Sequence, residues 1–61
     1  MELNLEPNIA DPDGFYDELL AVHQGLSKED SDALNARLIL ILANHVGDRD
    51  VLTAALKAAQ R

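Results

Sequence analysis

The fold is decided by the stretch Leu38-Ile39-Leu40-Ile41-Leu42-Ala43, six consecutive apolar residues near the middle of the chain. A run of this length is compatible with a buried strand or with a segment of a buried helix. The residues around it are mostly helix formers, and no other part of the sequence resembles a strand partner, so a helix is favoured. Ser27 and Asp30 stand three apart as in a capping box, and Gly47 supplies a left-handed stop. We therefore predict a helix over about residues 28–46.

Two shorter helices are predicted on either side of this central helix. The Asp-Pro pair at residues 11–12 is typical of a helix start and Gly25 of a helix end, which places the first helix at about residues 12–25. Its apolar residues recur three or four positions apart and form one stripe: Phe15, Leu19, Val22 and Leu26. The third helix, at about residues 49–60, is expected to cap on Asp48. Its apolar line is Val51, Leu52, Ala55, Leu56 and Ala59.

Residues 1–10 differ from the helical segments because their apolar residues are interspersed with polar ones and with Pro7. This pattern suits an extended arm that lies over the helices or on a neighbouring molecule. The predicted fold class is all-α, with a small three-helix module over residues 11–61 and an extended N-terminal arm over residues 1–10.

The central helix is apolar around its whole circumference, whereas a helix in a small bundle needs only one apolar stripe. Two short neighbours cover about half to two-thirds of a helix surface, and the rest would face water. We therefore predict a dimer that forms through the central helix, the alternative being that the flanking helices and the arm cover the whole run. The predicted interface residues are Leu38, Ile39, Leu40, Ile41, Leu42 and Val46. The predicted polar contacts are Arg37, Asn44, His45 and Asp48.

Length and charge also limit the partners that the chain is expected to have. A chain of 61 residues has barely enough apolar surface for a stable core, and without cysteine it has no disulfide. Its formal net charge of -6 repels phosphate backbones and anionic lipid headgroups, and one Tyr and one Phe give no platform for stacking bases. We expect the partner to be a second copy or another protein, and neither nucleic acid nor membrane.

A cytoplasmic location is expected from two further features. Residues 1–6 contain no basic segment followed by a long apolar run, as a secretory signal would. The apolar run at residues 38–43 is far shorter than the roughly 20 residues that span a bilayer.

The residue types of catalytic and metal sites are present without the spacing that such sites need. Ser27 and Ser31 belong to a helix start, and three dispersed glycines make no phosphate-binding loop. His23 and His45 stand too far apart in the sequence to form a local pair of metal ligands. We predict no enzyme activity, no cofactor and no metal. The alternative from another class is a small metal- or ligand-responsive sensor that uses the two histidines.

Three segments of the chain are distinctive: Leu5-Glu6-Pro7-Asn8-Ile9-Ala10-Asp11, Leu34-Asn35-Ala36-Arg37-Leu38 and Asn44-His45-Val46-Gly47-Asp48. With them the chain resembles, from Leu3 to Leu56, a family of short bacterial proteins known only as a domain of unknown function (number twenty-seven eighty-three). Members tend to be encoded beside flavin-dependent aromatic hydroxylases, so the resemblance implies an accessory role and assigns no catalytic residues. We therefore predict a non-catalytic interaction or accessory protein, with a flavin-dependent catabolic oxygenase as the partner that the resemblance implies.

Overall fold

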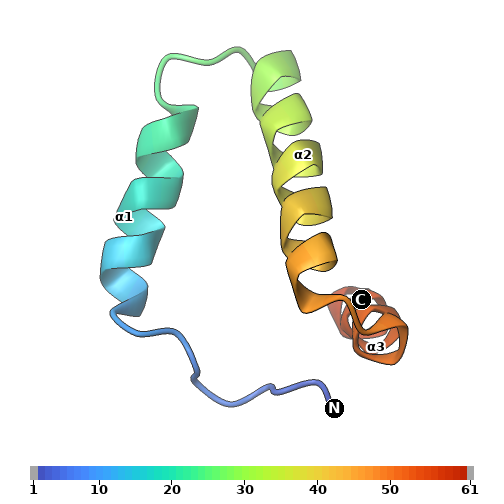
Figure 1. Ribbon diagram of the computed structural model, residues 1–61. Helices are drawn as coiled ribbons and strands as arrows, with labels where there is room; N and C mark the ends of the chain where they lie inside the picture. The colour runs from blue at the N-terminus through green and yellow to red at the C-terminus, as the bar shows by residue number, and fades with distance from the viewer. Residues whose placement is uncertain (1, 61) are drawn as a thin grey trace.

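Local capping signals define three helices, and the computed structural model, which describes residues 2–60, contains all three. They are α1 (Pro12–His23), α2 (Lys28–Val46) and α3 (Arg49–Ala59), and no strand occurs within residues 2–60. The prediction of an all-α fold of three helices is confirmed. Figure 1 shows α1 and α2 as the two limbs of a hairpin, with α3 following at the far end of α2.

Each helix begins at a side chain that accepts a hydrogen bond from an N–H group of its first turn, which has no partner inside the helix. The three caps are the predicted ones, Asp11, Ser27 and Asp48. Each accepts from the third residue of its helix, at 3.2 Å for the Asp11 Oδ1, 3.1 Å for the Ser27 Oγ and 3.2 Å for the Asp48 Oδ1. The Asp48 Oδ1 also accepts from the second helical residue at 2.9 Å. The starts of all three helices are therefore fixed by local chemistry.

The first cap has a left-handed backbone. Asp11 has a φ of 52°, a conformation that Asp tolerates better than most residues. Its carboxylate lies against Gly14, where an added Cβ would overlap the Asp11 Oδ2 and Cγ atoms. The glycine in the first turn therefore makes room for the cap.

The helix ends differ slightly from the prediction. α1 ends at His23, two residues early, because Gln24 is extended and the Leu26 N–H donates to the His23 carbonyl at 3.1 Å to form a turn. α2 ends as expected at Val46. Its C-cap is Gly47, which has a φ of 74° and donates its N–H to the Ala43 carbonyl at 2.9 Å. α3 ends one residue early, at Ala59, because the next residue is extended.

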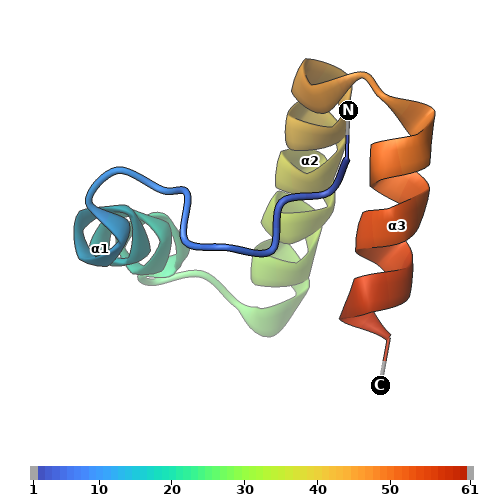
Figure 2. The same ribbon diagram turned by 90° about the horizontal axis from the view of Figure 1, so that it is seen from below.

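The hairpin of α1 and α2 is open. Figures 1 and 2 show the two helices apart, and in Figure 1 they diverge from the turn toward their free ends. α3 contacts α2 and crosses it steeply, since it is seen end-on where α2 runs along the page. The N-terminal arm crosses from the start of α1 toward the far end of α2, so it spans the open end of the hairpin.

The chain by itself encloses no core, because none of the side chains in residues 2–60 is buried. Its radius of gyration is 13.3 Å, against about 10.5 Å for a typical domain of this length. Its accessible surface is 5634 Å², against about 3,900 Å² for a folded monomer of this mass. In this structure the flanking helices and the arm do not cover the central apolar run.

Candidate interaction surface

The apolar stripe of α1 lies on the side that faces α2. Phe15, Leu19 and Val22 share this side of the helix with His23, whose ring contacts Ser31 of α2. Leu19 is half-buried, but Phe15 is 44% and Val22 54% exposed. The sequence predicted these residues as one stripe, and in the open hairpin that stripe is only partly covered.

A matching stripe runs along the facing side of α2, with residues alternately three and four positions apart: Ser31, Leu34, Leu38, Ile41 and His45. Ser31, Leu34 and Leu38, near the turn, are half-buried. Ile41 is 65% exposed and His45 is exposed as well. Burial therefore decreases along α2 from the closed end of the hairpin to its open end.

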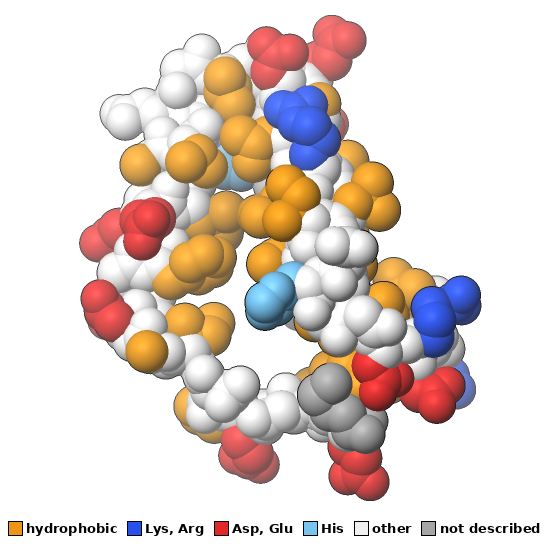
Figure 3. Space-filling model, viewed as in Figure 1, with side chains coloured by type: hydrophobic (Ala, Val, Ile, Leu, Met, Phe, Trp, Pro, Cys, Tyr) orange, Lys and Arg blue, Asp and Glu red, His pale blue; other side chains and the backbone are white. Residues whose placement is uncertain are grey.

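The two stripes line a space that we name the hairpin groove, defined by Phe15, Leu19, Val22, Leu34, Leu38 and Ile41. Leu26, which the sequence placed on the stripe of the first helix, lies beyond the end of α1, in the connection to α2. Figure 3 shows an opening between α1, the arm and α2, with hydrophobic side chains along both walls. In the same view, Asp and Glu side chains lie on the outer side of α1, away from the opening. An apolar opening of this kind is unfavourable in water, because its walls have no packing partners.

One side-chain hydrogen bond joins the helices at the closed end of the groove. The His23 Nδ1 and the Ser31 Oγ are 3.0 Å apart, and both residues are half-buried. The tautomer of the ring decides which of the two groups donates. The sequence placed Ser31 at a helix start and did not indicate this pair. The turn between α1 and α2 brings the two residues together, and no sequence spacing predicts it.

The predicted interface residues do not form one face of α2. Successive residues are about 100° apart on a helix, so the run from Leu38 to Leu42 points in all directions. Leu38 and Ile41 line the groove, whereas Leu40, 69% exposed, points away from Leu38. Arg37 and Asn44 are exposed between Leu40 and Ile41, and Leu42, four residues after Leu38, adjoins the groove stripe. Ile39 and Val46 are exposed on the remaining side.

The other two predicted polar contacts, His45 and Asp48, lie in different parts of the structure. His45 lies at the open end of the groove stripe, and Asp48 is the cap of α3. Asp48 is half-buried, and its Oδ1 accepts from the Asp50 and Val51 N–H groups in the first turn of α3. Of the predicted polar residues, His45 therefore belongs to the groove stripe itself, and Arg37 and Asn44 lie at its edge, beside Ile41.

α3 covers a different part of α2, where Ala43 is half-buried. The residues of α3 that are half-buried are Val51, Leu52, Ala54 and Ala55. The sequence had placed Leu56 in this apolar line, but Leu56 is 68% exposed. It lies outside the packed side because α3 meets α2 mainly through its first two turns.

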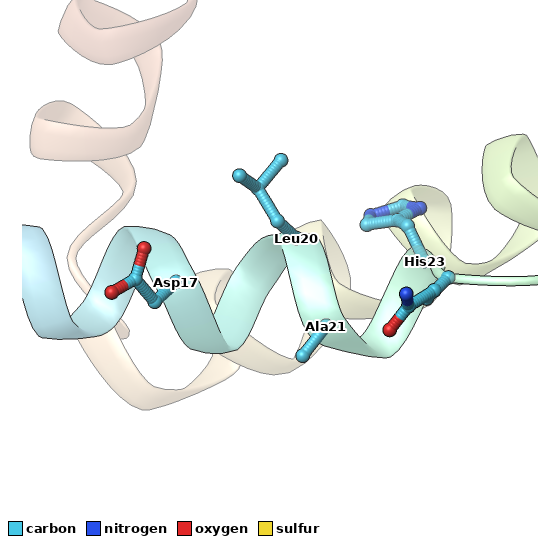
Figure 4. Close-up of a pocket in the computed structure, with 5 residues that line it drawn as sticks. Asp17, Leu20, Ala21 and His23 are labelled. Carbon is cyan, nitrogen blue, oxygen red and sulfur yellow. The ribbon is translucent and has the colours of Figure 1, made fainter.

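Two depressions on the surface of residues 2–60 are open to solvent. One is lined by Asp17, Leu20, Ala21, His23 and Gln24, all from α1 and its C-cap, so no second element forms a facing wall (Figure 4). Another lies along the arm, between Asn4 and Pro12. Within residues 2–60, no three side chains of the metal-binding types gather closely enough to hold an ion.

The helices of the described chain, residues 2–60, include none with the length and apolar character needed to cross a bilayer.

Comparison with known proteins identifies a family without assigning a function. No curated protein and no solved structure shows significant similarity to the chain. Residues 3–61, nearly the whole sequence, match the family described as "Protein of unknown function (DUF2783)". The chain therefore belongs to this family, as the motifs in its sequence had indicated.

Proposed function

We propose that the protein is a non-catalytic interaction or accessory protein, and that its apolar helical surface is covered by a second protein chain. The observation that supports this most strongly is the absence of any buried side chain among residues 2–60 of a chain that is 48% hydrophobic. A folded protein gains most of its stability from buried apolar surface. The surface that should form the core is therefore available for a partner.

The excess accessible area of the chain can be compared with the area of a typical protein–protein interface. The chain exposes about 1,700 Å² more than a folded monomer of its mass would. A standard protein–protein interface buries about 800 Å² on each partner. The excess is large enough for a permanent interface, so the proposed partner is one that stays bound while the protein works.

The depression on α1 is open to solvent, and this supports a non-catalytic role. Catalysis needs side chains held in a cleft that excludes water. Asp17 and His23 lie on the same helix six positions apart and point in different directions, with no facing element. The partner class suggested by the family resemblance is a flavin-dependent catabolic oxygenase, to which the chain would bind as a small subunit in the cytoplasm.

A pull-down of the tagged full chain from its native host tests the proposal. The wild type is compared with Leu38→Glu, which places a charge in the groove, and with Thr53→Glu, which adds the same charge on the exposed side of α3. We expect the wild type and Thr53→Glu to retain a stoichiometric protein partner, whether a second copy or another protein. Leu38→Glu should lose it.

The opposite pattern would contradict the proposal. It fails if the pure wild type is a stably folded single chain with no retained partner and Leu38→Glu is equally stable. In that case the groove would be closed in solution by the chain itself.

A further inference from the structure

We propose that the hairpin groove is filled by α2 of a second copy of this chain, so that two α1–α2 hairpins interlock around a twofold axis as a four-helix bundle. This inference rests on the proposed function and names the partner that covers the same surface. It also specifies which sides of α2 are inside the assembly and which remain outside.

The exposed area fits a permanent homodimer. If each copy buried its excess of about 1,700 Å², the interface would fall within the roughly 2,000–5,000 Å² typical of obligate homodimers. Those interfaces resemble a domain core that has been divided between two chains. Two open hairpins with no buried side chain in residues 2–60 of either copy would then share one core.

The distribution of apolar residues indicates which helix enters the groove. The larger apolar residues of α1 lie on two adjoining stripes: Phe15, Leu19 and Val22, and Tyr16 and Leu20. The same helix also carries exposed acidic residues that need water: Asp13, Asp17 and Glu18. α2 is apolar around most of its circumference along the run from Leu38 to Leu42, with exposed fractions of 51–69% for Ile39 to Leu42. A helix that is apolar on several sides is normally surrounded by neighbours. α2 is therefore the central helix of the bundle, and α1 is a peripheral one.

The groove is also complementary to itself. Both of its walls are formed by apolar side chains, and the acidic residues of α1 lie on the other side of that helix. The stripe of α2 that lines the groove of one copy can pack against the same stripe of the other copy, which is the requirement for a twofold interface. A foreign partner would have to supply a matching apolar helix, whereas a second copy always carries one.

The helix lengths agree with this arrangement. α2 has 19 residues and α1 has 12, which correspond to about 28 Å and 18 Å. An inserted α2 is therefore long enough to cover the whole apolar stripe of the partner's α1, including the open end where Phe15 and Ile41 are exposed.

One side of α2 is left outside the proposed bundle. Leu40, 69% exposed, is two residues after Leu38 and so points to nearly the opposite side of the helix. The proposal therefore places Leu38 and Ile41 at the interface and excludes Leu40, which the sequence had included.

Isotope-filtered NMR on an equal mixture of ¹³C-labelled and unlabelled wild-type chains tests the arrangement directly, because it detects only contacts between copies. We expect NOEs from Phe15 and Val22 of one chain to the Leu38 and Ile41 methyl groups of the other. Intermolecular NOEs confined to Leu40 would overturn the inference. So would a folded sample with no intermolecular NOE.

Two variants with the same change of charge give an independent test by sedimentation. Leu38→Glu should weaken self-association at least about a hundredfold, because each dimer would bury two unpaired carboxylates. Leu40→Glu should leave the dimer intact. If instead Leu40→Glu dissociates the dimer and Leu38→Glu does not, the copies associate through the other side of α2 and the inference is wrong.

These results separate the inference from the proposed function. A pure chain that is unfolded or monomeric, but folds at one-to-one stoichiometry on a different protein, would overturn the inference and support the proposed function. A stably folded single chain that retains no protein partner would overturn both.

Discussion

At the scale of single residues, the helix starts contribute stability that can be measured separately from any interface. Ser27 caps α2, with its Oγ accepting the Asp30 N–H at 3.1 Å. Ser27→Ala should lower the free energy of unfolding by about 1 kcal/mol, because the N–H group loses its partner. Ser27→Asp should stay close to the wild type, since Asp caps a helix about as well. Urea unfolding followed by circular dichroism at one fixed protein concentration checks this; equal losses in both variants would show that the cap contributes nothing.

Gly14 provides a second test at this scale. Replacing glycine by alanine in a helix usually stabilises it by up to about 1 kcal/mol. Here a Cβ would overlap the Asp11 carboxylate and displace the cap, which costs about the same amount. Gly14→Ala should therefore change the free energy of unfolding little in the wild type and should stabilise the Asp11→Ala variant. A double-mutant cycle measures this, and the same gain in both backgrounds would contradict it.

At the scale of elements, the sequence predicted what is determined locally. The three caps and the left-handed stop at Gly47 depend on neighbouring residues, so their positions follow from the sequence. The opening between α1 and α2 does not, because it depends on contacts between residues far apart in the chain or in another chain. For the same reason the spacing of Phe15 and Val22 predicted a stripe but not how much of it is covered, and nothing in the sequence indicated the bond between His23 and Ser31.

Gly47 controls the direction in which α3 leaves α2. Its φ of 74° suits glycine, and an alanine there should destabilise the fold by about 1 kcal/mol through backbone strain. The cost would come from the backbone alone, since an added Cβ would lie at an ordinary 3.8 Å from the Asn44 carbonyl oxygen. Gly47→Asn should lose less, because Asn adopts the left-handed region more readily. Chemical unfolding of both variants measures the difference; if Asn and Ala cost the same, the strain is not the cause.

At the scale of the whole molecule, folding and association should be one process. Residues 2–60 of the chain contain no buried side chain, so under the proposed homodimer the stability of the chain depends on the second copy. The melting temperature should therefore rise as the protein concentration is raised from micromolar to millimolar. Differential scanning calorimetry over this range measures the shift. A melting temperature independent of concentration would indicate a chain that is stable without a partner.

If a single chain is unable to cover its own apolar surface, the folded protein contains at least two chains. Sedimentation equilibrium of the pure protein measures this without any label or variant, because it gives the mass of the folded particle. We expect a helical species of twice the 6.7 kDa chain mass. A helical, cooperatively folded species with the mass of one chain at all concentrations would contradict it.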